Sequence, residues 1–199
     1  GDLTFDSTGG AITNNFTFAG GTLTGAGGTV TIGGNLNLTG ATALAQGATI
    51  FELNAAVGNQ TITSTLSLGA IRANKAAGNV LTSGAVTIAT LTLDSGGFAP
   101  GAALTIGTLA DLNGGTYAPS SGVITNHNGT TNFDGADVTI GGTSDLRLNG
   151  PVTSSGGAGT ITMTAGALLL GNNAMDLSGV TLTHTVGGVV TSNTGGAQT

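Results

Sequence analysis

The stretch VTIATLTLDSGGFAPGAALTI, residues 86–106, decides the fold class of this 199-residue chain. It contains three triplets, at 86–88, 91–93 and 104–106, in which two apolar residues flank a threonine. Such alternation with a period of two, rich in β-branched residues, is typical of short strands with one buried face. The intervening SGG supplies glycines that accept positive φ in sharp turns. The stretch therefore predicts short β-strands joined by tight turns.

The same pattern, in which two apolar residues flank a polar one, recurs along most of the chain. Further copies lie at 3–5, 16–18, 30–32, 36–38, 66–68, 138–140, 146–148 and 161–163. No helices are expected, because the 3.6-residue periodicity is missing and Glu, Lys and Arg are scarce. Strands that begin at 16 and 36, or at 66 and 86, are 20 residues apart. This period predicts a single all-β domain over 1–199, a β-solenoid (parallel β-helix) of roughly ten coils of about 20 residues.

Longer segments repeat as well. SGGFAPGAALTI (95–106) aligns with GGTYAPSSGVIT (114–125), so that Pro100 precedes Pro119 by 19 residues. AGGTLTGAGGTVTI (19–32) also aligns with the second segment and places Leu23 on Tyr117. A single coil cannot bury its own apolar side, whereas stacked coils bury a continuous row. Repetition is therefore a requirement of the fold and needs no chemistry.

Composition excludes several classes of partner. With 39% hydrophobic and 6% charged residues, the chain is expected to fold rather than to remain disordered. Its net charge of −6 offers no basic footprint for nucleic acid or anionic lipid. No apolar run approaches the roughly 18 residues of a membrane span, so no membrane insertion is expected. The chain has no cysteine and begins with glycine, which fits a processed, secreted product or an excised fragment.

A family resemblance rests on NQTITSTLSLGAIRANKAAGNVLTSGAVTIATLTLDSGG, residues 59–97. This segment resembles the β-strand repeats of large secreted bacterial surface proteins, the autotransporter-associated and filamentous-haemagglutinin-like adhesins. The resemblance implies an extracellular, right-handed β-helix that serves as a stalk, adhesin or filament. Its shared motifs are structural, so no catalytic residue is carried over.

Catalytic chemistry has one weak candidate. Asp134 and Asp137 in NFDGADVTI are the closest carboxylate pair, with His127 upstream and Arg147 downstream. Paired carboxylates can hydrolyse or cleave polysaccharides. However, DGAD also has the composition of a turn, and supporting groups are scarce. We therefore expect a turn and no enzymatic activity.

The other polar candidates are also interpreted as structural. His127 in an Asn/Gly turn and His184 on a strand do not form a metal motif, and no cofactor or metal is expected. Arg72 and Lys75 in IRANKAAG are expected on a solvated turn; the alternative is an ion pair with a neighbouring subunit.

Threonine pairs suggest a third function, ice binding by a flat threonine ladder. The alternative is that threonine simply suits the outward positions of strands. The pairs are Thr22/Thr24, Thr29/Thr31, Thr61/Thr63, Thr90/Thr92, Thr160/Thr162 and Thr181/Thr183. Their irregular spacing argues against alignment on one face.

The leading functional hypothesis is a secreted structural subunit of an extracellular filament, sheath or surface fibre. Its partner would be another copy, joined by end-to-end stacking or by exchange of a terminal strand. The expected contacts are Leu3 and Phe5 at one end and Val189 and Val190 at the other. The alternative is an adhesin shaft or a module that binds a glycan or cell surface. Phe98 and Tyr117 are the aromatic residues that would serve such a module if exposed, and they are equally well explained as core fillers.

Overall fold

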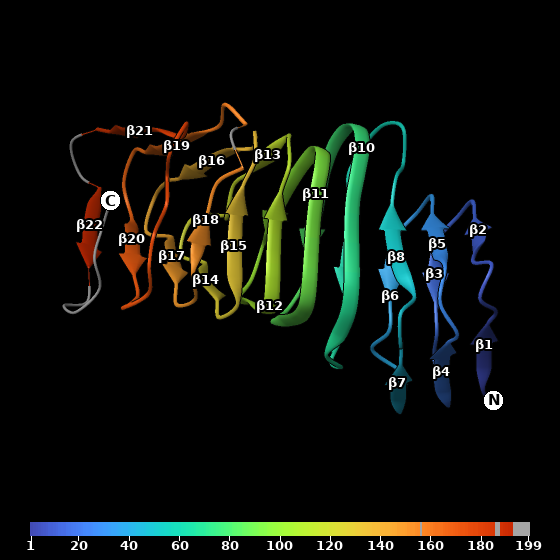
Figure 1. Ribbon diagram of the computed structural model, residues 1–199. Helices are drawn as coiled ribbons and strands as arrows, with labels where there is room; N and C mark the ends of the chain where they lie inside the picture. Colours follow the sequence, from blue (N-terminus) through green and yellow to red (C-terminus); the bar gives the residue numbers. More distant parts are fainter. Residues whose placement is uncertain (156, 186–187, 193–199) are drawn as a thin grey trace.

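The computed structural model describes residues 1–155, 157–185 and 188–192, and within these residues the regular structure is entirely β. The strands form an elongated stack, with β1 (Leu3–Phe5) at one end and β22 (Val189–Ser192) at the other (Figure 1). Every strand pairing is parallel. The expected all-β solenoid without helices is confirmed for the described part of the chain.

One column of aligned residues shows the coil spacing. Successive members pair through the backbone and lie 19 to 23 positions apart in the sequence. They are Gly10, Val30, Phe51, Ile71, Leu91, Ala110, Thr131, Val152 and Met175. These nine rungs correspond to nine turns, close to the expected ten, and at about 4.8 Å per rung the stack is about 40 Å long.

Each coil contributes strands to three faces, which we number in chain order. The first face contains β1 (Leu3–Phe5), β4 (Thr22–Gly25), β7 (Ala43–Ala45), β14 (Ile124–His127), β17 (Asp145–Leu148), β20 (Ala167–Leu170) and β22 (Val189–Ser192). The second contains β2 (Gly10–Ile12), β5 (Thr29–Ile32), β8 (Ile50–Leu53), β15 (Thr130–Phe133) and β18 (Val152–Thr153). The third contains β3 (Phe16–Thr17), β6 (Leu36–Asn37), β9 (Gln60–Thr63), β13 (Thr116–Tyr117), β16 (Asp137–Ile140), β19 (Thr160–Met163) and β21 (Thr181–His184).

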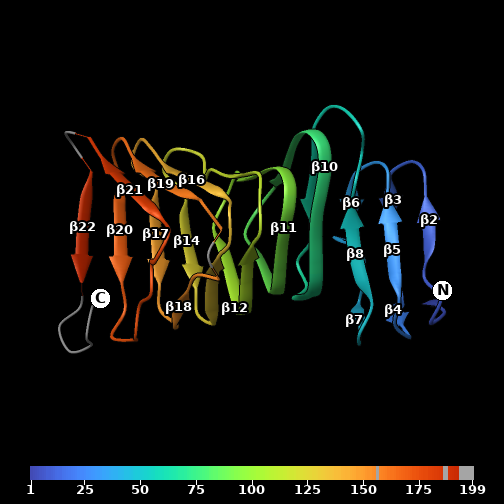
Figure 2. The ribbon, with the colours of Figure 1, turned by 45° about the horizontal axis from the view of Figure 1, so that its top comes forward.

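Three long strands at the middle of the stack turn the corners without a break. β10 (Leu68–Thr82) and β11 (Val86–Pro100) touch all three faces, and β12 (Leu104–Leu112) covers two. Figure 2, viewed from a tilted direction, shows β10 and β11 wrapping around the stack. The triplets at 86–88 and 91–93 therefore lie on the first and second faces of one coil. The triplet at 104–106 lies on the first face of the next coil, because Val86 pairs with Leu104.

The core is a set of inward columns of aliphatic side chains. In most strands alternate residues are buried, as the burial of Val138 and Ile140 on β16 illustrates. Phe98 and Tyr117 stack with their ring centroids 6.0 Å apart, so the alignment of these two repeats was right. The alignment of Leu23 with Tyr117 was wrong, because Leu23 pairs with Leu3 on the first face. The segment 19–32 has the same residue pattern, but Leu23 lies on the first face whereas Tyr117 lies on the third.

Glycines with positive φ mark the corner between the second and third faces. Gly58, Gly78, Gly96, Gly115 and Gly135 lie there on five successive coils with φ between 71° and 111°. Where they stack, there is no room for a side chain: a Cβ on Gly115 would lie 2.2 Å from the carbonyl oxygen of Gly96. Among the described residues, only glycines have positive φ. These glycines therefore adopt the positive φ that was expected of them in the sharp turns.

Candidate functional surfaces

The first coil places both predicted N-terminal contacts at inward positions. Leu3 pairs with Leu23, which is fully buried, yet Leu3 is 37% exposed because no described coil covers it. Phe5 is half-buried, and its ring centroid lies 5.6 Å from that of Phe16 and 6.0 Å from that of Phe51. The open side of the first coil therefore presents apolar core positions.

The last described coil presents a similar apolar surface. Val190 pairs with buried Leu168 and occupies an inward position, 42% exposed. Val189 is 51% exposed, but it pairs with Ala167 and alternates to the outward side. Leu182, which was not predicted, pairs with buried Ile161 and is 46% exposed. The strand triplet TLT at 181–183 was the signal that could have identified Leu182.

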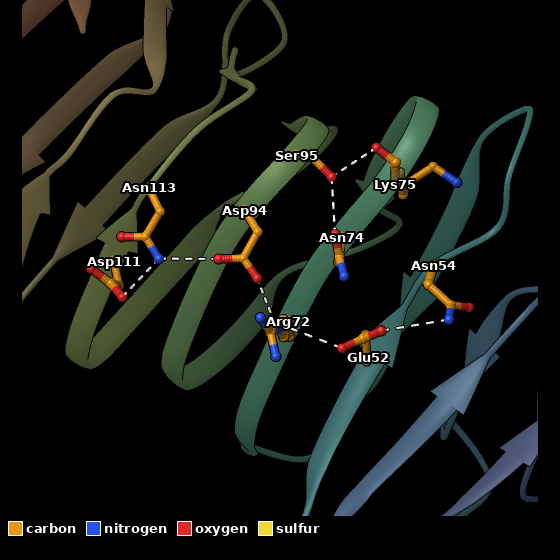
Figure 3. A network of polar contacts seen from close by, with 9 residues as sticks. All are labelled: Glu52, Asn54, Arg72, Asn74, Lys75, Asp94, Ser95, Asp111 and Asn113. Carbon is orange, nitrogen blue, oxygen red and sulfur yellow. Dashed lines mark hydrogen bonds and ion pairs between the residues drawn. The ribbon is translucent and has the colours of Figure 1, made fainter. Parts of the chain in front are cut away.

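A connected set of polar side chains follows the outward side of the second face. We call it the polar ladder: Glu52, Arg72, Asp94, Asp111, Asn113 and Asn132. Glu52 pairs with Arg72 along the column that continues through Thr92 to Asp111 and Asn132. Asp94 and Asn113 lie beside this column, just past the corresponding strand segments. Figure 3 shows five of the six side chains and their contacts.

Ion pairs and hydrogen bonds link the ladder continuously. Arg72 Nε bonds Asp94 Oδ2 and lies 3.7 Å from Glu52 Oε2. Asn113 Nδ2 donates to Asp94 Oδ1 and to Asp111 Oδ2, each at 3.1 Å. Asn132 Nδ2 donates to Asp111 Oδ1 at 2.9 Å. The hydrogen bond that Arg72 donates to Asp94, together with the negative charges of Asp94 and Glu52, raises the pKa of Arg72, so the guanidinium stays charged.

Lys75 departs from its predicted place. Arg72 and Lys75 lie within β10 rather than on a solvated turn, and Lys75 is fully buried. Its Nζ donates to the carbonyl oxygen of Ala55 and to Oε1 of Gln60, both at 3.1 Å. Burial without a carboxylate partner lowers the pKa of Lys75. The prediction of a solvated turn was wrong because the polar acceptors that hold Lys75 come from the preceding coil.

His127 was also misplaced by the sequence interpretation. It ends β14 and is buried, and the corner follows at Asn128 and Gly129. Its Nε2 lies 3.1 Å from the Tyr117 hydroxyl and its Nδ1 lies 3.0 Å from Thr131 Oγ1. Burial lowers the pKa of His127 to about 3 and raises the pKa of Tyr117. Tyr117 and Phe98 are buried, so they are core residues rather than exposed aromatic contacts.

The candidate acid pair is not assembled into a site. Asp134 Oδ1 accepts the backbone N–H of Gly157 at 2.9 Å, and Asp137 Oδ1 accepts the Thr160 hydroxyl at 2.7 Å. Gly135 between them has a φ of 111°, as expected for a turn. Arg147 pairs instead with Asp145, 3.1 Å away. Within the described ranges, no three His, Cys, Asp or Glu side chains come together as a metal site. His184 lies exposed on β21.

The threonine pairs are distributed over three faces. Thr22/Thr24 belong to the first face, Thr29/Thr31 and Thr90/Thr92 to the second, and the other three pairs to the third. Only Thr160/Thr162 and Thr181/Thr183 stack directly on each other. The described coils therefore contain no flat threonine array longer than two adjacent pairs.

Comparison with known proteins gave no match to a family model, a curated protein or a solved structure. In the part of the chain that the structure describes, no helix is long and apolar enough to cross a membrane.

Proposed function

We propose that this chain is a structural segment of an extracellular bacterial filament, sheath or surface fibre, and that copies join end to end. The observation that supports this proposal is the exposure of inward core positions on both end coils. Leu3 lies at one end, and Leu182 and Val190 lie at the other. Of the large apolar residues that are exposed in the described chain, only Val57 and Ile124 lie between these ends.

The partner follows from the way the coils pair within the chain. Each coil joins the next by parallel strands, and Leu3 stacks on Leu23 as Leu168 stacks on Val190. A second copy offers strands with the same direction and the same three faces, so its first coil can continue the last coil of its neighbour. The free N–H and C=O groups of both edges would then be paired. Secretion and the bacterial surface rest on the sequence resemblance alone.

Electron microscopy and sedimentation velocity over a concentration series test this proposal. Leu3→Asp and Leu182→Asp should each prevent filaments, because each places a carboxylate in the proposed joint. Val57→Asp is the matched control, since Val57 is 78% exposed on the side of the stack. Single short rods at every concentration, or filaments that tolerate both end variants, would contradict end-to-end assembly.

A further inference from the structure

The coils on either side of the polar ladder show that the fold does not need charged residues there. The same outward column begins with Ala11 and Thr31 and ends with Thr153. Small neutral side chains therefore suffice at equivalent positions on other rungs. Exposed ion pairs also contribute little to stability, typically about 0–1 kcal/mol. Folding therefore does not explain why three of the chain's nine acidic residues and one of its three basic residues lie in this ladder.

The side chains of the ladder hold one another in place through these contacts and keep unused hydrogen-bonding capacity. Each carboxylate oxygen of Asp94 and Asp111 accepts one hydrogen bond or ion pair, whereas an ionised carboxylate offers about four acceptor sites. Arg72 uses only Nε in these contacts, and its side chain is 41% exposed. The two terminal nitrogens of Arg72 therefore remain available as donors to a ligand. Because the side chains are already held in place, binding costs little conformational entropy.

From this arrangement we propose that the polar ladder binds a neutral, polyhydroxylated glycan chain that lies along the axis of the solenoid. A sugar hydroxyl both donates and accepts, so neighbouring hydroxyls match the carboxylate acceptors and the guanidinium donors. From Glu52 to Asn132 the column rises four rungs, about 19 Å, which is long enough for several sugar units. Asn74 adds an exposed amide whose Nδ2 makes no hydrogen bond within the described chain.

Charge selects among glycans. Glu52, Asp94 and Asp111 outnumber the single cation Arg72, and the other two basic residues, buried Lys75 and ion-paired Arg147, add no free cation nearby. Sulfated or uronic acid chains are therefore repelled, and a neutral chain is favoured. The described surface of the ladder has no exposed aromatic ring for stacking, so affinity rests on hydrogen bonds alone. The glycan proposal does not depend on end-to-end assembly.

Titration of the isotope-labelled chain, followed by NMR, tests the site with defined probes. The probes are the β-1,4-linked hexasaccharides of glucose and of N-acetylglucosamine, and a heparin hexasaccharide. We expect a neutral probe to bind with a Kd of about 1 mM and to shift the signals of Arg72 Nε and of the side-chain amides of Asn113 and Asn132. Heparin should leave these signals unchanged.

Variants separate the ladder from the rest of the surface. Arg72→Gln and Asp111→Ala should each weaken binding about tenfold, the loss expected for one charge-assisted hydrogen bond. Asp137→Ala on the third face is the matched control and should bind normally. Two ladder variants are used so that the test still stands if one of them fails to fold. The proposal is overturned if neither neutral probe shifts the ladder signals, if both ladder variants bind as the unaltered chain does, or if heparin binds more tightly.

Discussion

Nε2 of His127 lies 3.1 Å from the hydroxyl oxygen of Tyr117, and both side chains are fully buried in the core. Thr131 completes the group at Nδ1. The imidazole is held by two hydroxyl groups, and no carboxylate of the described chain is hydrogen-bonded to it. Its protonated form therefore has no counter-ion to offset the loss of hydration.

The first prediction concerns pH. In the unfolded chain His127 takes up a proton near pH 6.5, whereas in the folded chain its pKa is about 3. Between these values the unfolded state binds more protons, so stability falls as the pH falls. As the pH falls through this range, His127 alone should lower the free energy of unfolding by about 1.4 kcal/mol per pH unit. Urea denaturation at pH 7, 6 and 5 measures the slope before most carboxylates titrate.

His127→Gln supplies the control, because glutamine is neutral throughout this range and retains hydrogen-bonding groups. Its stability should change much less between pH 7 and 5 than that of the unaltered chain. An equal slope in both proteins would show that another group causes the acid sensitivity.

Much of the fold follows from residue alternation. Triplets such as VTI at 86–88 identify strands because threonine and β-branched residues alternate on a half-buried surface. Equivalent segments that begin at 16 and 36 pair as their spacing suggested. The phase of a segment around the three faces was harder to predict, because Leu23 and Tyr117 carry the same local pattern on different faces.

The polar sites could not be predicted from local sequence. His127 in NHNG has the composition of a turn, but the strand extends to His127 and the turn begins one residue later. The polar ladder depends on coil lengths of 19 and 20 residues that bring Glu52, Arg72 and Asp111 onto one column. A one-residue error in any coil would move a side chain from the outside to the core.

The second prediction concerns the glycine corner. Gly115→Ala should destabilise the chain by about 3 kcal/mol or more, because a positive φ alone costs about 1–2 kcal/mol in an L-residue and steric overlap adds to it. The overlap is with the Gly96 carbonyl oxygen, 2.2 Å from the added Cβ. Thermal or urea unfolding measures the difference.

Gly84→Ala is the matched control for this prediction. Gly84 has a φ of 82°, close to the 71° of Gly115, but an added Cβ would meet no atom within 4 Å. It should therefore cost only the conformational strain, about 1–2 kcal/mol. Equal losses at both positions would mean that the stacked carbonyl moves aside freely.

The third prediction is that the polar ladder contributes little to stability. Arg72→Gln should lower the free energy of unfolding by no more than about 1 kcal/mol, because the Arg72 side chain is 41% exposed and water screens its ion pairs. The difference should shrink further when the salt concentration is raised roughly tenfold, from about 0.05 to about 0.5 M. A loss of several kcal/mol would instead assign the ladder a structural role and weaken the argument for a ligand.

The last prediction concerns Gln46, which bridges two sheets. On the first face, β1, β4 and β7 form a separate three-stranded sheet, and β10 pairs with β8, β9 and β11 but not with β7. The buried Gln46 side chain spans this interruption. Its Nε2 donates to the carbonyl oxygens of Thr49 at 2.8 Å and Ala70 at 2.7 Å, and its Oε1 accepts the Gly69 N–H at 2.7 Å.

Gln46→Ala should cost about 3 kcal/mol or more, because it removes the partners of up to three backbone groups at about 1–3 kcal/mol for each group left unsatisfied. Hydrogen exchange should report the change locally as faster exchange of the Gly69 amide. Asn37→Ala is the control, since Asn37 bonds only its near neighbour Thr39 at an exposed position. If the Gly69 amide stayed protected in Gln46→Ala, the two sheets would be joined by aliphatic packing alone, and the Gln46 side chain would be dispensable at the interruption.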